Sequence, residues 1–436
     1  MDTSRYLDNS EEHQYDIARG QAAADSEQTI GIGVIDPPPP GPIIAQESAR
    51  SQNWRAWYAA LKAILPIYIA TRLAFLTISC LAPLFTVKDF SPRAFHLNTL
   101  WHSWNHWDAE IFTTIARFGY THYERAVFFP LYPLLERAAT FVTGGDVILA
   151  GLLVSNLASL GLCIVLYRLV SEDFSAEQAE RSVLYLALFP TAFFFASGYN
   201  EALFLFLALL CFYHTRHSHW WLAGLCGFLA SLTRSAGILL ALPFAYEYLR
   251  QRQFQLKAIR WNALAGVLIP GGVALYALWC YIQFHDPLAF SHGEVYWQRS
   301  LAFPGYGILH SMLNIHRSSG LLSFQALRNA TDLIPDLLIL LFVVLSFVGP
   351  WKLPRQLWVY GVYAAALYIF LQLFPKGGTG LYPLESVSRY ILEVFPAFII
   401  MAAAGKNKLF HLCYLMVSGA ALFFLLTQFL TGHWVL

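Results

Sequence analysis

Residues 101–132, WHSWNHWDAEIFTTIARFGYTHYERAVFFPLY, are the stretch that decides the fold. They carry the acidic residues Asp108 and Glu110, tryptophans at positions 101, 104 and 107, and an aromatic run that begins after Val127. No window of about 20 residues in this stretch is apolar enough to span a bilayer, although apolar segments flank it on both sides. Because Trp and Tyr side chains settle at the headgroup level, we expect a structured loop that rests on a membrane surface.

The composition predicts an all-α polytopic membrane protein. Of the 436 residues, 57% are hydrophobic and only 13% are charged, which exceeds the roughly 50% apolar content of soluble domains. The net charge of +1 gives no basic surface for nucleic acid, so no nucleic-acid partner is expected. All six cysteines fall inside apolar runs, where they behave as small hydrophobic residues. We expect neither disulfides nor a metal-thiolate site.

Two segments differ in character. Residues 1–55 are polar, acidic near the start and contain four consecutive prolines, so we expect a disordered cytoplasmic tail. Residues 56–436 are expected to form one transmembrane domain of about eleven helices. The apolar stretches lie at about residues 63–85, 147–170, 183–198, 201–214, 220–233, 236–249, 262–284, 333–350, 356–375, 390–405 and 409–430.

The loop charges predict an orientation. If the tail is cytoplasmic, lysines and arginines gather at the cytoplasmic ends of the spans, as in the clusters at residues 250–260 and 352–355. The loops at 86–146, 285–332 and 376–389 then lie outside. Polar residues gather at the outer ends of spans, and we expect them to converge on one outward-facing cavity. They are Asp108, Glu110, Asn200, Glu201, Arg234 and Arg389.

Asp108 is the candidate catalytic carboxylate, and its alternative role is structural. A helix from Ala109 to about Phe118, ended by Gly119, would place Asp108 at the helix N-cap. Glu110 lies about 200 degrees further around such a helix, so the two carboxylates could meet at a metal only in an irregular turn. The spacing of His102 and His106 resembles a zinc pair, but the segment lacks the glutamate that such helices carry between the histidines.

Arginines give the next candidates. Arg72 interrupts the first span. It is either a functional residue or part of a structural salt bridge, with Glu201 as the candidate partner. Arg234 and Arg389 either grip a lipid phosphate with the guanidinium fork or extend to the membrane surface from span ends.

The second large outer loop, residues 285–332, adds two candidates for the wall of the cavity. These are Trp297 and Arg299, in the sequence HGEVYWQRS. The alternative for this segment is an interfacial aromatic anchor.

Five motifs resemble one family. In chain order, the motifs are WDAEIFTTIARFGY with FFPLYPLLER, then GYNEALF, WWLAGLCGFLASLTRSAGILLALP, DPLAFSHGEVYWQRS and SVSRYILEVFP. Together they are similar to the PIG-V family, the second mannosyltransferases of GPI-anchor assembly and their prokaryotic relatives. The resemblance implies the GT-C membrane glycosyltransferase fold, a polyprenyl-phosphate sugar donor and an acidic residue in the first outer loop.

The resemblance also implies residue roles. Asp108 takes the role of the base, with Trp107 beside it, and Glu201 orients the acceptor or the donor sugar. The family often has Gly and an aromatic residue after this Asp, whereas Ala109, Glu110 and Ile111 follow here. The resulting Asp-x-Glu pair keeps a divalent metal open as a cofactor.

The expected reaction is the transfer of mannose by a single displacement with inversion at the anomeric carbon. A carboxylate takes the proton of the acceptor hydroxyl while the lipid phosphate leaves. The acceptor, a glycolipid, a glycan or a protein, stays open. Alternatives are a different polyprenyl-phosphate sugar or, in another class, a transporter or lipid flippase. Compact outer loops and the lack of a visible retention signal favour a prokaryotic cell membrane over the endoplasmic reticulum.

Overall fold

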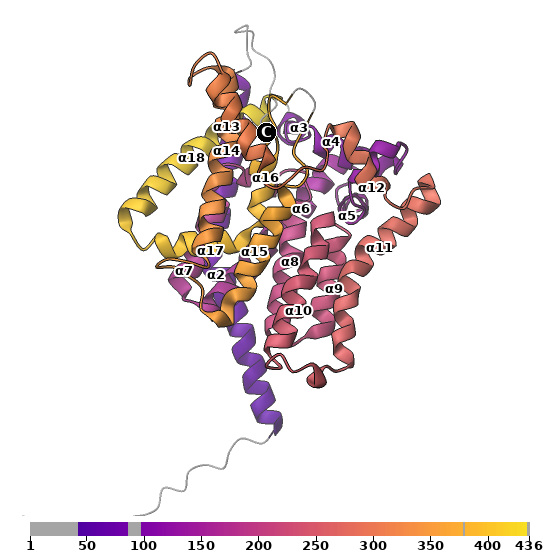
Figure 1. Cartoon of the computed structure of the whole chain (residues 1–436), viewed down its shortest axis with the longest axis vertical. Coiled ribbons are helices and arrows are strands. Elements are labelled where there is room, and N and C mark those ends of the chain that lie inside the picture. Colours follow the sequence, from indigo (N-terminus) through magenta and orange to yellow (C-terminus); the bar gives the residue numbers. More distant parts are fainter. Residues whose placement is uncertain (1–41, 86–96, 378–379, 434–436) are drawn as a thin grey trace, which may run out of the picture. The chain divides into compact units, whose positions relative to one another are not determined.

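The computed structural model describes residues 42–85, 97–377 and 380–433. Over these residues the chain is helical and has no strand, apart from one isolated antiparallel bridge between Arg299 and Lys376 (Figure 1). The predicted all-α class is therefore confirmed. The chain divides into two units, Met1–Trp54 and Arg55–Leu436, and the packing described below belongs to the second. Most of the predicted tail lies outside the described residues, but its last part is helical, because α2 begins at Pro42.

Most of the longer helices coincide with predicted apolar stretches, whereas the stretch predicted at 183–198 is divided, because one helix ends at Ala187 and a 3-10 turn follows at Ala192–Phe195. The α-helices are α2 (Pro42–Leu81), α3 (Leu97–His102), α4 (Asp108–Phe118), α5 (Leu131–Ala139), α6 (Val147–Asp173), α7 (Ala176–Ala187), α8 (Glu201–Arg216), α9 (Trp220–Ser231), α10 (Ala241–Arg250), α11 (Ala265–Phe284), α12 (Ala289–His292), α13 (Tyr306–Arg317), α14 (Phe324–Leu345), α15 (Trp358–Leu371), α16 (Val387–Tyr390), α17 (Phe395–Ala404) and α18 (Lys408–Leu430). Short 3-10 segments are η1 (Ala82–Phe85), η2 (Tyr123–Val127), η3 (Ala192–Phe195), η4 (Ser235–Leu240), η5 (Leu256–Ala258), η6 (Trp261–Leu264), η7 (Gly293–Trp297), η8 (Arg355–Leu357) and η9 (Ile391–Glu393).

Four helical stretches in the described part of the chain are long and apolar enough to cross a membrane. They are Asn53–Leu84, Val147–Asp173, Trp261–Phe284 and Lys408–Leu430. A fifth crossing results if Val387–Glu393 and Phe395–Ala404, which are bent by 81°, act as one span. The protein is thus an integral, multi-pass membrane protein. The number of about eleven spans stays a prediction, because several of the helices are shorter than the roughly 20 residues that a bilayer requires.

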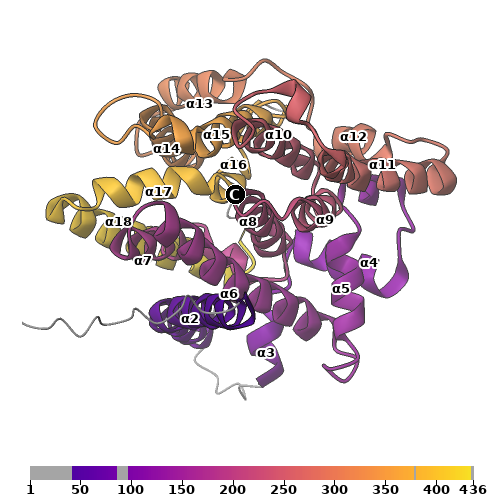
Figure 2. The same cartoon turned by 90° about the horizontal axis from the view of Figure 1, so that it is seen from below.

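Helix α8 lies in the centre of the bundle, between α6 and α9 (Figure 2). Twelve of its 16 residues are buried, and it spans about 24 Å. On the side of α8 away from α6, helices α9 and α11 cross so closely that their backbones are in contact. A Cβ atom added at Gly224 would lie 2.2 Å from the carbonyl oxygen of Ala265, and one at Gly272 would lie 2.4 Å from that of Phe228. Small residues at both positions therefore permit this crossing.

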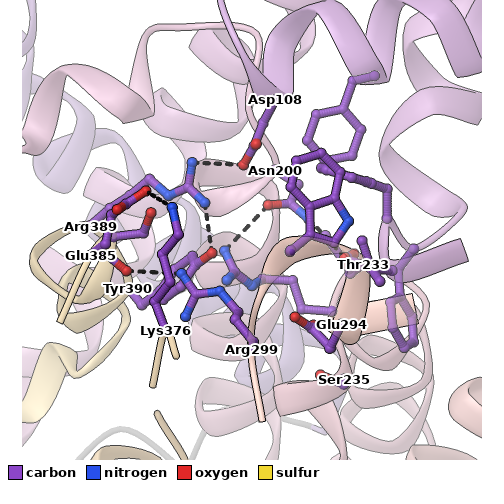
Figure 3. Close-up of a pocket in the computed structure, with 17 residues that line it drawn as sticks. Asp108, Asn200, Thr233, Ser235, Glu294, Arg299, Lys376, Glu385, Arg389 and Tyr390 are labelled. Atoms are coloured by element: carbon purple, nitrogen blue, oxygen red, sulfur yellow. Dashed lines mark hydrogen bonds and ion pairs between the residues drawn. The ribbon is translucent and has the colours of Figure 1, made fainter. Parts of the chain in front are cut away.

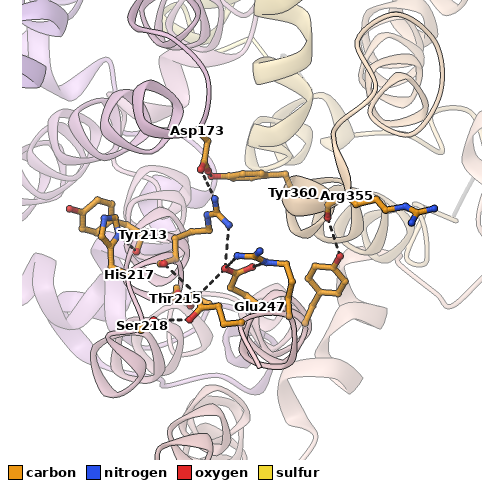
Figure 4. A network of polar contacts seen from close by, with 12 residues as sticks. Asp173, Tyr213, Thr215, His217, Ser218, Glu247, Arg355 and Tyr360 are labelled. Carbon is orange, nitrogen blue, oxygen red and sulfur yellow. Dashed lines mark hydrogen bonds and ion pairs between the residues drawn. The ribbon is translucent and has the colours of Figure 1, made fainter. Parts of the chain in front are cut away.

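Charged residues fix the C-terminal end of α8 (Figure 4). Arg216 contacts the Asp173 carboxylate of α6 at 2.5 Å and the Glu247 carboxylate of α10 at 3.2 Å. Arg250 adds two hydrogen bonds to Glu247, both of 2.6 Å. Tyr360 of α15 donates a hydrogen bond to Asp173. Four helices are thus tied together at the end of α8 opposite to Glu201.

The two large predicted outer loops pack against each other. Their helices α3, α4, α12 and α13 lie at one end of Figure 1, which agrees with the prediction that these loops share a side. Tyr123 of the first loop donates a hydrogen bond of 2.5 Å to Asp286 of the second, and His292 contacts the same carboxylate at 2.8 Å. These two contacts lower the pKa of Asp286. Trp297 donates to the backbone carbonyl of Glu124 at 3.3 Å.

Candidate active site

Helix α4 presents Asp108 at its first residue. The helix is amphipathic, with Phe112 and Ile115 among its buried residues, and it ends at Gly119, whose φ of 74° is a left-handed conformation suited to glycine. The prediction of this helix is confirmed. The N-cap prediction is wrong, because the N-cap residue is Trp107 and no side chain caps the helix. Trp107 has a φ of 51°, a conformation that costs free energy in a non-glycine residue.

The Asp108 side chain instead joins a chain of ion pairs (Figure 3). Its Oδ2 lies 2.8 Å from Nη1 of Arg389, and Nε of Arg389 lies 3.1 Å from Oε1 of Glu201. Nη1 of Arg234 lies 3.0 Å from the same Glu201 oxygen and 2.8 Å from Oε1 of Glu393. Two arginines and three carboxylates from four separate parts of the chain therefore form one continuous network.

Most of the network is buried. Glu201 is 1% exposed at the start of α8, where the positive end of the helix dipole favours an anion. Arg389 donates a hydrogen bond of 2.8 Å to the Tyr390 hydroxyl. Its guanidinium also lies 5.1 Å from the Tyr199 ring and 5.3 Å from the Phe194 ring. Such cation–π contacts are strongest where water is excluded.

A polar cavity of about 170 Å³ opens beside this network. Five of the six residues predicted to converge lie together here, since Asp108, Asn200, Arg234 and Arg389 line the cavity and Glu201 bonds to two of them. Its other polar or aromatic lining residues are Phe112, Phe128, Phe129, Thr233, Ser235, Glu294, Trp297, Arg299, Lys376, Glu385, Ser386 and Tyr390. The predicted wall residues Trp297 and Arg299 are thus in place.

Charges in the cavity differ in how far they are compensated. Lys376 pairs with Glu385 at 2.6 Å. Arg299 donates only to the backbone carbonyls of Phe374 at 3.0 Å and Glu385 at 2.8 Å, and it pairs with no carboxylate among the described residues. Glu294 has neither an ion pair nor a side-chain hydrogen bond in that same part of the structure. Burial raises its pKa, which the charges of Arg299 and Arg234 counteract.

An apolar cavity of about 300 Å³ adjoins the polar one. The two share five lining residues, namely Arg234, Ser235, Glu294, Arg299 and Tyr390. Beyond these, the second cavity is lined mainly by apolar side chains. They are Ala236, Ile238, Phe290, Phe370, Leu371 and Phe374. A polar compartment and an apolar compartment therefore meet at the uncompensated Arg299.

Three predicted site residues lie elsewhere. Trp107 packs on Phe429 of α18, with ring centroids 5.2 Å apart, and does not line the cavity. Glu110 is exposed on α4 and does not line it either.

Arg72 is also outside the cavity. It donates to the Ser159 hydroxyl and lies over the ring of Tyr68, with 4.5 Å to the centroid. The proposed salt bridge between Arg72 and Glu201 is wrong, because Glu201 pairs with Arg234 and Arg389.

The possible metal site is not assembled. Asp108 is held by Arg389 while Glu110 is exposed. Within residues 42–85, 97–377 and 380–433, no group of three or more His, Cys, Asp or Glu side chains is placed to hold a metal ion. The Asp-x-Glu pair therefore does not fit a metal.

Several residues of the site were not predicted from the sequence. Three of them lie inside the quoted motifs, and their polar side chains within otherwise apolar sequence were the available signal. The residues not predicted are Glu294, Lys376, Glu385, Tyr390 and Glu393. Lys376 and Glu385 lie outside the motifs, and only the folded chain brings them to the cavity.

Comparison with known proteins adds relatives. The chain is 32% identical over 152 residues to GPI alpha-1,6-mannosyltransferase 2 of Mus musculus, an alignment that covers 30% of this chain and 29% of that protein. The human protein of the same name is 31% identical over 144 residues, covering 31% and 29%. The alignments thus span less than a third of the length of these relatives.

Solved structures resemble the chain more distantly. ArnT from Cupriavidus metallidurans bound to undecaprenyl phosphate has a TM-score of 0.49 and 15% identity, with 79% of this chain and 60% of that chain covered. The oligosaccharyltransferase of Archaeoglobus fulgidus in the apo form has a TM-score of 0.42 and 13% identity, with 84% and 56% covered.

The family match is broader than these pairwise alignments. The family model described as mannosyltransferase (PIG-V) matches residues 57–353, which is more than half of the 436-residue chain. It includes α4 with Asp108, the start of α8 with Glu201, and η7 with Glu294. The chain therefore belongs to the PIG-V family of mannosyltransferases.

Proposed function

We propose that this protein transfers mannose from a polyprenyl-phosphate donor to a hydroxyl group of a glycolipid, glycan or protein acceptor, with inversion at the anomeric carbon. The observation that carries the proposal is the pair of adjoining cavities. The polar one offers carboxylates and hydrogen-bonding groups for a sugar, and the apolar one offers Phe290, Phe370 and Phe374 to a prenyl chain. A lipid-linked sugar has these two parts, joined by a phosphate.

Arg299 is the best placed residue for that phosphate. It lines both cavities, and its backbone-directed hydrogen bonds fix the guanidinium without neutralising it. A planar, fixed guanidinium is suited to phosphate oxygens. The sequence led us to expect that Arg389 and Arg234 bind the phosphate. In the structure both already pair with carboxylates. We assign them instead to holding Asp108 and Glu201.

Asp108 is the proposed base. Arg389 contacts Oδ2, and Oδ1 has no hydrogen-bond partner within the described part of the chain, so it can accept a proton. The acceptor oxygen forms a bond to the anomeric carbon while the bond from that carbon to the phosphate oxygen breaks. The hydroxyl proton passes to Asp108, and the electron pair of the broken bond stays on the phosphate, where Arg299 stabilises the developing charge.

Membership of a mannosyltransferase family disfavours the transporter alternative. The position of the site points the same way, because its charged residues lie at the ends of helices and in the predicted outer loops. Transporters commonly hold substrate near the bilayer midplane between repeats. Mannose as the transferred sugar is inferred from the family.

The test is product analysis by mass spectrometry with purified protein, polyprenyl-phosphate mannose or glucose, and a panel of glycolipid acceptors. The wild type should transfer mannose. Asp108→Asn should still fold, because Arg389 keeps its ion pair with Glu201, and should lose at least roughly 100-fold in rate. Glu124→Gln, a change of an exposed carboxylate in the same loop, is the control and should keep its rate. Full activity of Asp108→Asn would remove Asp108 from catalysis, and transfer of glucose alone would overturn the mannose assignment.

A further inference from the structure

Glu294 occupies a fixed position between the two cavities. Its neighbour Gly293 packs so closely on the first outer loop that an added Cβ would lie 2.9 Å from a methyl carbon of Val127. The Trp297 indole is tied to the backbone of Glu124, and the backbone N–H of Arg299 donates to the carbonyl of Glu294 at 3.0 Å. The short segment η7 is thus held at both ends, and Glu294 lines both cavities. Figure 3 shows Glu294 in the polar cavity.

This carboxylate differs from the others that line the polar cavity. Asp108 pairs with Arg389 at 2.8 Å, and Glu385 pairs with Lys376 at 2.6 Å. Glu294 pairs with no group in the described residues, although it is partly buried and its pKa is raised by that burial. A partly buried carboxylate without a partner is costly. Glu294 is therefore available to accept a hydrogen bond from a ligand in the cavity.

The chemistry of that ligand follows from the neighbours of Glu294. A phosphate at Arg299 would be repelled by a carboxylate, so Glu294 does not bind the phosphate itself. The part of the donor joined to the phosphate is the sugar, whose hydroxyl groups donate hydrogen bonds. An ionised carboxylate accepts such bonds more strongly than a neutral oxygen does. A neutral sugar hydroxyl thus fits this position.

We propose that Glu294 accepts a hydrogen bond from a hydroxyl group of the donor sugar, and that it thereby selects the sugar that the enzyme transfers. This inference rests on the proposed function and extends it to a residue that determines specificity. A donor without that hydroxyl leaves the partly buried carboxylate unpaired. The loss of such a charge-assisted bond corresponds to a rate lower by roughly 10- to 100-fold.

The experiment compares wild type and Glu294→Gln with polyprenyl-phosphate mannose and its 2-, 3-, 4- and 6-deoxy analogues. The wild type should transfer one of the deoxy sugars roughly 10- to 100-fold more slowly than mannose. In Glu294→Gln this difference should shrink to a few-fold, while the penalties for the other analogues stay as they are. Val295→Ala, a change of an exposed residue in the same segment, is the matched control and should keep the wild-type pattern.

Two results separate the possible failures. If the wild type transfers mannose but Glu294→Gln keeps the same selectivity for every deoxy donor, this inference is overturned and the proposed function stands. If the wild type transfers no mannose at all, the proposed function is overturned and the inference falls with it. Competition binding of the same donors to both proteins reads the selectivity without turnover, so a slow variant still gives a decisive result.

Discussion

Replacement of Arg389 by Met tests the ion-pair network most directly. Arg389 is 8% exposed in its side chain and bridges Asp108, 21% exposed, and Glu201, 1% exposed. Methionine fills a similar volume but carries no charge. The substitution leaves Glu201 with Arg234 as its only cation and leaves Asp108 with none within the described residues.

The expected magnitude follows from the charges. The network holds two arginines and three carboxylates, so its formal charge is +2 − 3 = −1. Arg389→Met changes this to −2 within a buried region. Removal of one partner from a buried ion pair costs about 3–5 kcal/mol. The partial exposure of Asp108 places the expected loss near the lower end, at about 3 kcal/mol.

A second substitution checks the charge argument. Arg389→Met combined with Glu201→Gln restores the formal charge to −1 and removes the buried carboxylate that has lost a partner. The double variant should therefore be more stable than Arg389→Met alone, although two changes in a core normally add their costs. Arg125→Met is the control, because Arg125 is a partly exposed arginine with one hydrogen bond, to Thr121, and its loss should cost less than about 1 kcal/mol.

The assay is thermal unfolding in detergent, followed by tryptophan fluorescence. The order of melting temperatures should be wild type, close to Arg125→Met, then the double variant, then Arg389→Met. If Arg389→Met melts with Arg125→Met, the network does not stabilise the fold. If the double variant melts below Arg389→Met, charge imbalance is not the cause of the loss.

Two further predictions concern α4 and α5. Gly119→Ala should lower the melting temperature, because Gly119 has a φ of 74° with open space around it, so that backbone strain alone costs about 1 kcal/mol. Gly419→Ala, in a helix interior with equally open space, should leave it unchanged or raise it, and equal shifts would contradict this account. Burial raises the pKa of Glu136 from 4.5 to about 8, against the opposing effects of Thr113 and Arg117. A raised carboxyl pKa contributes stability below pH 4.5 that is lost as the pH rises to about 8. Glu136→Gln should therefore gain melting temperature relative to wild type between pH 5 and pH 9, and a constant difference between the two proteins would refute the shift.

The sequence alone was sufficient for the class of the protein, for the family and for local structure. The helical membrane class depends on composition and on the length of apolar runs. Both are properties of the linear sequence and do not depend on how the chain folds. The helix of residues 109–118 was predicted to its last residue, because its end depends on the left-handed conformation that Gly119 adopts locally. The gathering of polar residues at one end of the spans also followed from the positions of the span ends.

Only the tertiary structure decided which charges compensate each other. Asp108 was predicted as a possible cap because local sequence shows its helix but not Arg389, which comes from the last predicted outer loop. Arg234 and Arg389 read as phosphate ligands from the sequence, whereas the folded chain pairs both with carboxylates and leaves Arg299 uncompensated. For the same reason, only the folded chain shows that Glu294 lines the cavity without an ion-pair partner among the described residues. The state of a charge depends on the neighbours that the fold brings within a few ångströms, and spacing along the chain does not contain that information.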